Sequence, residues 1–110
     1  MTTAKQIVRL GQISQLVLDV KLAALHTAAS KRQHSLDLLT ALSGVANAPD
    51  LSLVAEHQAQ MRYQQWAQAR RAELNLVLAR QTAEVAIARD EAVQVFGRNQ
   101  AVQGLHAKRR

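Results

Sequence analysis

The sequence predicts an all-α protein, a two-helix antiparallel coiled-coil hairpin whose second helix is the longer. Residues with strong helix propensity (Ala, Leu, Gln, Arg and Glu) fill long stretches of the 110-residue chain. The single proline, Pro49, lies in the one strong cluster of turn-forming residues. Apolar residues recur at alternating three- and four-residue steps on both sides of that cluster, which is the seam pattern of a coiled coil. A pair of helices from a larger bundle is the alternative.

The two arms of the predicted hairpin, about residues 5–44 and about residues 51–107, carry similar apolar ladders. The ladder residues are Val8, Leu18, Leu22, Leu25, Ala29, Leu36 and Leu39 in the first arm and Leu74, Leu78, Val85, Ala88, Ala92, Val95 and Val102 in the second. The residues that interrupt the ladders are Gly11, Gln15, Arg32, Gln81 and Asn99. Ile13, Leu16, Val17 and Val20 widen the apolar face near the start. Because aromatic residues are only 3% of the chain, we expect a thin seam rather than a thick core.

The turn is predicted at about residues 45–50. Gly44 can supply a left-handed stop after the first helix. Pro49 fits an opening turn, and Asp50 or Ser52 can cap the second helix. Everything before and after this segment is expected to be helical.

A hairpin folded near residue 47 sets a definite register between its arms. The numbers of opposing residues would then sum to about 94, which places Trp66 against Ala28 and Ala29. A large residue against two small ones suits a packed seam. Tyr63 and Trp66, three residues apart, could instead form a recognition pair for a second partner.

The unequal arms predict an overhang at the end of the second helix. The arms differ by about 17 residues, or roughly 25 Å at 1.5 Å per residue. The first helix is therefore expected to end opposite residues near 90, leaving about residues 91–110 without intramolecular cover. Exposed apolar surface of this kind usually marks a partner surface. We predict that this overhang is the functional end of the molecule.

The predicted partner-binding residues combine apolar area with positive charge. They are Arg89, Val95, Phe96, Arg98, Leu105, Lys108, Arg109 and Arg110. Gly97 and Gly104 lie seven residues apart and share one helix face, where another backbone could approach closely. Each glycine costs a helix about 0.8–1 kcal/mol relative to alanine, which calls for a reason. A frayed end that tolerates glycine is the alternative.

The net charge, the absence of cysteine and the absence of long apolar runs indicate the kind of partner and the cellular location. Fourteen Lys and Arg against eight Asp and Glu give a net charge of +6. This excess favours an acidic partner, whether nucleic acid, anionic lipid or an acidic protein surface. There is no cysteine, so disulfides and thiolate chemistry are excluded. Apolar runs are short and the first residues lack a signal-peptide core, so we expect a cytoplasmic protein without membrane insertion.

The sequence points away from enzyme, cofactor and metal chemistry. The adjacent Asp90 and Glu91 diverge by about 100° on a helix and do not converge on a substrate. No phosphate-binding loop or nucleophile elbow is present. The four histidines, His26, His34, His57 and His106, lack the three- or four-residue spacing of a metal site on one helix. We therefore expect a non-enzymatic protein with no cofactor.

Residues 88–110, "ARDEAVQVFGRNQAVQGLHAKRR", resemble the C-terminal end of FliJ-type flagellar export proteins and their type III secretion relatives. The matching elements are an Ala- and Arg-rich lead-in, then Phe96-Gly97-Arg98, then the basic terminus. The specific similarity covers about a fifth of the chain, and only Arg89, Phe96, Arg98 and the basic terminus can be transferred from it. The chain is shorter than typical members, which puts in doubt any site those members carry towards the hairpin tip.

The resemblance implies an antiparallel coiled coil that acts as the stalk of an export ATPase. Proteins of this family insert their paired termini into the ATPase hexamer, promote its assembly and activity, and contact the export gate and chaperones. The implied location is cytoplasmic and peripheral to the inner-membrane export apparatus. No catalytic residue transfers, because the family's role is mechanical and regulatory.

Two other functions are compatible with the sequence. A basic helical nucleic-acid-associated protein would bind with affinity that falls steeply with salt. Its basic residues are spread along both arms rather than gathered with aromatics, so we do not expect specific binding. A structural coiled coil whose overhang pairs with a second copy, forming a homodimer, is the other alternative.

Overall fold

The computed structural model describes residues 3–46 and 54–108, which form two helices and confirm the antiparallel hairpin. Helix α1 spans Ala4–Ala46 and helix α2 spans Val54–Lys108. At 43 and 55 residues, α2 is the longer, as predicted. Helix α1 continues through Gly44 to Ala46, so the prediction that this glycine ends the helix is wrong. The predicted caps Asp50 and Ser52 lie outside the described residues.

The start of α1 is stabilised by a reciprocal capping box. The Gln6 backbone N–H donates to Thr3 Oγ1 at 3.2 Å, and the Thr3 backbone N–H donates to Gln6 Oε1 at 3.0 Å. These two bonds satisfy backbone donors that the first turn of a helix leaves free. The helix therefore begins at the position where this sequence supplies the cap.

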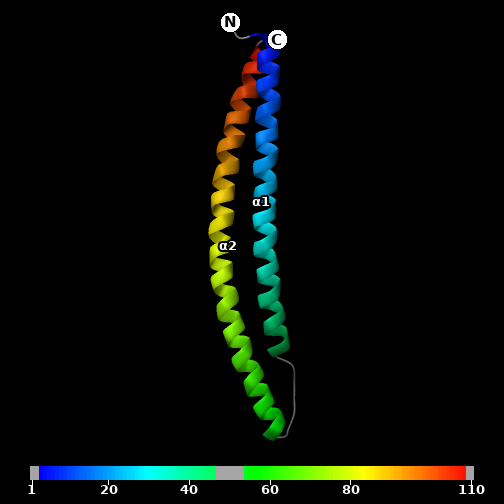
Figure 1. Ribbon diagram of the computed structural model, residues 1–110, viewed down its shortest axis with the longest axis vertical. Coiled ribbons are helices and arrows are strands. Elements are labelled where there is room, and N and C mark those ends of the chain that lie inside the picture. The colour runs from blue at the N-terminus through cyan, green and yellow to red at the C-terminus, as the bar shows by residue number, and fades with distance from the viewer. Residues whose placement is uncertain (1–2, 47–53, 109–110) are drawn as a thin grey trace. The chain divides into compact units, whose positions relative to one another are not determined.

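The contacts divide the chain into two units, each an antiparallel pair of helical segments. Unit 1 comprises Met1–Ala29 and Ala83–Arg110, and unit 2 comprises Ser30–Thr82. In unit 1 the red end of α2 lies beside the blue start of α1 (Figure 1). In unit 2 the end of α1 packs against an interior stretch of α2.

The seam follows a seven-residue repeat on α2 from Ala67 onwards, and Tyr63 lies one residue off that repeat. The seam residues of unit 1 are Ile7, Gly11, Ser14, Leu18, Lys21, Leu25 and Ala28 on α1 with Val85, Ala88, Ala92, Val95, Asn99, Val102 and His106 on α2. Those of unit 2 are Arg32, Ser35, Leu39 and Leu42 on α1 with Tyr63, Ala67, Arg71, Leu74, Leu78 and Gln81 on α2. All are buried or half-buried, at the a and d spacing of a coiled coil.

The apolar ladder predicted for the second arm is confirmed, while that of the first arm is partly wrong. On α1 the seam passes through Gly11 and Arg32, which looked like interruptions, whereas Val8, Leu22 and Ala29 are exposed. The reason is that seam positions recur every 3.5 residues on average, whether they hold apolar or polar residues. A ladder built from apolar residues alone therefore drifts from the seam onto a flank of the helix.

The predicted register is wrong by about five and a half turns of helix. The contacting pairs Gln15–Asn99, Gly11–Gln103 and Arg32–Thr82 have residue numbers that sum to 114, not to about 94. The shift brings Leu18 towards Val95 in unit 1 and Leu42 towards Leu74 in unit 2. It also satisfies polar residues that the predicted register would leave without partners across the seam.

The predicted C-terminal overhang is therefore wrong, because the extra length of α2 lies at its start. Ala67 is the first buried residue of α2, and it packs with Leu42 of α1. The preceding residues 54–66 are exposed except for Glu56 and Tyr63, which are half-buried. The green start of α2 accordingly passes the end of α1 (Figure 1). Residues 92–108 are instead covered along one side by the start of α1.

Cysteine cross-linking tests the register. Ser35 Oγ donates to Gln81 Oε1 at 2.6 Å, so Ser35→Cys with Gln81→Cys should form an intramolecular disulfide in air. The control is Ser35→Cys with Ala59→Cys, the pair that the register near 94 would bring together, which should stay reduced. Thiol titration and gel mobility distinguish the two. Closure of the control pair would contradict the register described here.

A matched pair of leucines tests where unit 2 keeps its core. Leu74 is 4% exposed and clusters with Leu42 and Ala67, whereas Leu76 is 70% exposed. Leu74→Ala should lower the free energy of unfolding by about 2–3 kcal/mol, the lower part of the range for buried leucine because the seam is thin. Leu76→Ala should change it by less than about 0.5 kcal/mol. Urea denaturation monitored by circular dichroism measures both.

Candidate functional site

The net charge of the protein is concentrated at one end of the hairpin. Residues 1–18 and 92–110 contain six Lys and Arg and no Asp or Glu, while residues 19–91 contain eight of each. We call residues 1–18 and 92–110 the basic end. The +6 net charge of the chain therefore belongs entirely to this end. A concentrated charge of one sign attracts an acidic surface over roughly the Debye length, about 8–10 Å at physiological salt.

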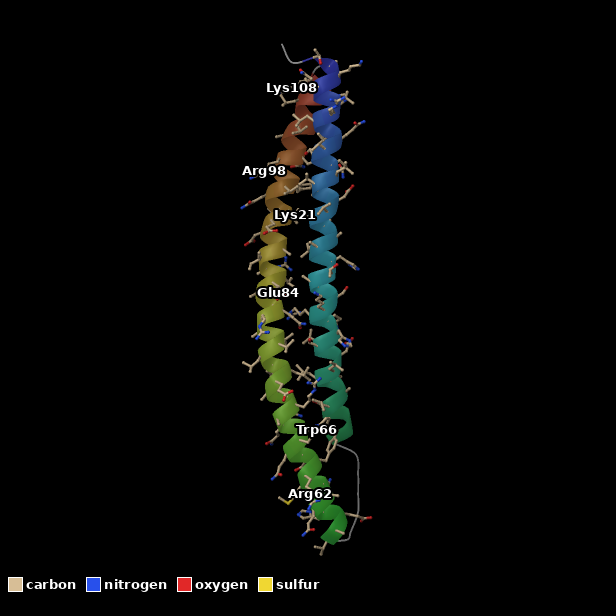
Figure 2. The ribbon with its side chains drawn as sticks, in the orientation of Figure 1. Lys21, Arg62, Trp66, Glu84, Arg98 and Lys108 are labelled. Carbon is tan, nitrogen blue, oxygen red and sulfur yellow. The ribbon has the colours of Figure 1, made fainter. Side chains whose placement is uncertain are left out.

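Four basic side chains of this end lie within the described residues. Lys5 and Arg9 are on the first turns of α1, and Arg98 and Lys108 are on the last turns of α2. Figure 2 labels Arg98 and Lys108 on the orange-to-red part of α2. His106 and Lys108 occupy the last turn of α2, where positive charge suits the helix dipole. Antiparallel packing is what gathers these charges from opposite ends of the sequence.

A polar network holds the two segments of the basic end in register. Asn99, 7% exposed, donates from Nδ2 to Gln15 Oε1 at 3.3 Å. Gln103 Nε2 lies 3.3 Å from both Asn99 Oδ1 and the backbone carbonyl oxygen of Gly11. Gly11 lies directly against this contact, since a Cβ there would be in van der Waals contact with the Gln103 amide at 3.5 Å. A buried amide in a coiled-coil seam favours the one register that satisfies it.

An ion pair marks the inner limit of the basic end. Lys21 Nζ lies 3.1 Å from Glu91 Oε2, joining α1 and α2 in unit 1. Both side chains are more than a third exposed, so the pair contributes less than about 1 kcal/mol. Its main effect is on the distribution of charge. Glu91 neutralises Lys21, so the net positive charge is left to residues 1–18 and 92–110.

The predicted partner-binding residues divide between the seam and the surface. Val95 is 8% exposed and lies in the seam, so the prediction that it has no intramolecular cover is wrong. One side of it lines a groove between the two helices, and its role as a contact residue stays a prediction. Phe96 is 49% exposed, and Leu105 is also exposed. Arg89, Arg98 and Lys108 are exposed, and Arg109 and Arg110 lie outside the described residues.

Phe96 and Arg98 lie on opposite flanks of the hairpin and cannot contact one small partner surface together. Phe96 is one heptad before Gln103, which lines a groove with Val8 and Gln15. Arg98 lines a different groove with Leu10 and Val17. Two residues apart on a helix means a separation of about 200° around its axis. The Phe96-Gly97-Arg98 segment therefore faces three directions.

Gly97 and Gly104 share one face of α2, as their seven-residue spacing predicts, and it is the outer face. A Cβ added at either position would meet nothing within 4 Å. The described residues of this chain thus make no close backbone approach there. The predicted role of these glycines in admitting a partner backbone stays a prediction.

The apolar flank of α1 is a feature of the basic end that the prediction of a C-terminal site missed. Leu10, Ile13, Val17 and Val20 are exposed and recur at steps of three, four and three residues. The same spacing was visible in the sequence, where Ile13, Val17 and Val20 only seemed to widen the apolar face of the seam. Because the seam takes Ile7, Gly11 and Leu18 instead, this second stripe is left outside it.

A second apolar surface lies in unit 2. Trp66 is 55% exposed, so its predicted position in the seam against Ala28 and Ala29 is wrong. It stacks at a tilt on Tyr63, with ring centroids 5.6 Å apart. The two rings line an open groove of about 300 Å³ with Leu38 and Leu42. Figure 2 places Trp66 on the early part of α2, close to Arg62.

Residues 3–46 and 54–108 contain neither a metal-binding cluster nor a membrane-spanning helix. No group of three or more His, Cys, Asp or Glu in these ranges could hold a metal ion. Neither helix, over the part described, is long and apolar enough to cross a membrane.

Comparison with known proteins leaves the family open. No protein-family model matches the chain, and no curated protein or solved structure matches it either. The similarity of residues 88–110 to the FliJ-type terminus therefore stays a prediction.

The neighbours Val95 and Phe96 separate seam from surface at this end. Val95→Ala should lower the free energy of unfolding by about 1–2 kcal/mol, because it removes buried methyl groups from a thin seam. Phe96→Ala should change it by less than about 0.5 kcal/mol, since the ring is half exposed and outside the seam. Thermal and urea unfolding give both values. A larger loss for Phe96→Ala would show that the ring, rather than Val95, supports the hairpin.

Proposed function

We propose that the protein is a non-enzymatic coiled-coil stalk of a flagellar or type III protein export apparatus. In this proposal the basic end enters the acidic bore of the export ATPase hexamer and promotes its assembly or turnover. The observation that carries the proposal is the confinement of the whole net charge to residues 1–18 and 92–110, beside exposed apolar side chains. The resemblance of residues 88–110 to the FliJ-type terminus supports it and names the partner.

The geometry changes how such a stalk would act. The segment proposed to enter the ring is a pair of helices, not the single unpaired helix that the overhang predicted. The polar network of Gln15, Asn99 and Gln103 holds this pair in one register. A paired end presents Lys5 and Arg9 from α1 together with Arg98 and Lys108 from α2. Charges on two sides of a stalk can approach carboxylates on several subunits of a ring at once.

The chemistry of such a stalk is differential binding rather than catalysis by its own residues. An asymmetric stalk in the bore stabilises some subunit interfaces more than others. It can shift the conformational equilibrium of the ATPase only by the difference in its binding free energy for the two conformations. The exposed apolar residues would add buried area to the charge contacts. Contacts with the export gate and chaperones belong to the same proposal through the family resemblance.

Charge reversal on α1 tests the proposal. The chain should stimulate ATP hydrolysis by the export ATPase of the source organism, and Lys5→Glu with Arg9→Glu should abolish most of that stimulation. Both side chains are exposed and outside the seam, so helicity should be unchanged. The matched control is Arg62→Glu with Arg80→Glu, two exposed arginines outside the basic end, which should retain stimulation.

Three results would contradict this function. Absence of stimulation by the wild-type chain would do so, as would equal stimulation by the Lys5 and Arg9 variant. The third is co-purification of nucleic acid with binding that is lost in the same variant, which would favour the nucleic-acid alternative. Nuclease treatment of the lysate before purification keeps these outcomes separate.

A further inference from the structure

An apolar groove with a basic rim runs along one flank of unit 1. It is open, about 260 Å³ in volume, and lined by Leu10, Ile13 and Val17 of α1 and by Val95, Arg98 and Val102 of α2. The apolar stripe of α1 forms one edge. Both helices contribute, and the lining covers about two turns of each, from Leu10 to Val17 and from Val95 to Val102.

The edge that α1 contributes has the spacing of a helix-packing surface. Leu10, Ile13, Val17 and Val20 follow each other at steps of three, four and three residues, and all four are exposed. Such a stripe is the complement of an amphipathic helix with anchors at i, i+3, i+4 and i+7. Two packed helices with an adjoining apolar stripe leave a position where a third helix could complete a three-helix bundle.

The edge that α2 contributes is basic. Arg98 lies on the rim of the groove, and Leu105 follows one heptad later on the same edge. Lys108, three residues further, continues that edge. Arg98 and Lys108 are ten residues apart, or about 15 Å along the helix. The basic end contains no acidic residue that could neutralise them.

We infer that this groove binds an acidic amphipathic helix of a partner protein as the third helix of a bundle. The apolar face of the partner would pack on Leu10, Ile13 and Val17. Carboxylates on one edge of that helix, ten or eleven residues apart, would approach Arg98 and Lys108. The inference concerns the same end as the proposed function, but it does not require an ATPase.

Charge complementarity selects this occupant over the alternatives. The basic end of a second copy of the chain would bring more positive charge to a rim that is already positive. A flat anionic membrane surface would contact convex side chains and leave the recessed Val95 and Val102 uncovered. A helix about 10 Å across fits between two edges and reaches the floor.

Direct binding to a designed helix tests the inference. The probe is a fluorescently labelled three-heptad peptide with leucine on one face and glutamate at two edge positions ten residues apart. Its matched partner carries lysine at those two positions. The wild-type chain should bind the glutamate peptide at least about tenfold more tightly than the lysine peptide, as measured by fluorescence anisotropy.

Variants on the two flanks locate the binding. Ile13→Gln should weaken binding of the glutamate peptide about tenfold, whereas Leu22→Gln on the other flank should not; their exposures, 51% and 48%, are nearly equal. Arg98→Glu with Lys108→Glu should reverse the preference in favour of the lysine peptide, and Arg89→Glu should leave it unchanged. A reversed preference cannot come from unfolding, and circular dichroism confirms helicity.

Four outcomes would overturn the inference. They are equal binding of the two peptides, equal weakening by Ile13→Gln and Leu22→Gln, binding to anionic vesicles with the same dependence on Ile13 and Arg98, and a wild-type dimer that Ile13→Gln dissociates. The third would assign the groove to a membrane and the fourth to a second copy. If peptide binding behaves as expected while ATPase stimulation is absent, the inference stands and the proposed function fails. If ATPase stimulation is present while the peptide results are contrary to expectation, the proposed function stands and the inference fails.

Discussion

The polar network at the basic end, Gln15–Asn99–Gln103 with the Gly11 carbonyl, is the constraint on which the arrangement of unit 1 depends. A seam that mixes small, polar and medium-sized apolar residues offers little difference in apolar burial between one register and the next. A buried amide is different, since moving it by one heptad removes its partners and leaves it unsatisfied at a cost of about 1–3 kcal/mol. In unit 2, Ser35 with Gln81 and Arg32 with Thr82 act in the same way. The apolar residues provide attraction, and the polar ones choose the alignment.

This division of roles explains how much of the molecule was predictable. Helix content, antiparallel pairing and the α2 ladder from Leu74 to Val102 all follow from propensity and period, which are local properties. Register is not local: it depends on which side chains meet across the seam, and Asn99 looked like an interruption when it is a determinant. Assuming that α2 starts level with the end of α1 put the extra length at the wrong end. That one assumption produced the overhang and the misplacement of both Val95 and Trp66.

The positive charge of the candidate site could be predicted from the sequence, but the contribution of both helices to it could not. A basic end around Arg98 and Lys108 follows from the sequence of residues 92–110 alone. The contribution of Lys5 and Arg9 requires the register, since only the pairing of distant segments gathers the positive charge in one place. Likewise, Leu10 and Ile13 become a surface only when Ile7 and Gly11 are known to occupy the seam. The candidate site, predicted as one C-terminal segment, is thus formed by both helices.

A seam with so many small and polar residues also explains why both units leave apolar surface outside it. Positions such as Gly11, Ser14 and Lys21 occupy seam layers that would hold leucine in a self-sufficient hairpin, while Ile13, Leu16 and Val20 lie outside. Moving apolar residues from the seam to a flank weakens the isolated hairpin and strengthens its attraction for another helix or surface, since buried area contributes about 25 cal/mol per Å² wherever it is buried. The exposed flanks are therefore the surfaces at which contact with another helix would bury the most apolar area. The same reasoning makes unit 2, with Trp66 half exposed beside Tyr63, a second exposed apolar surface, whereas at the basic end positive charge accompanies the apolar surface.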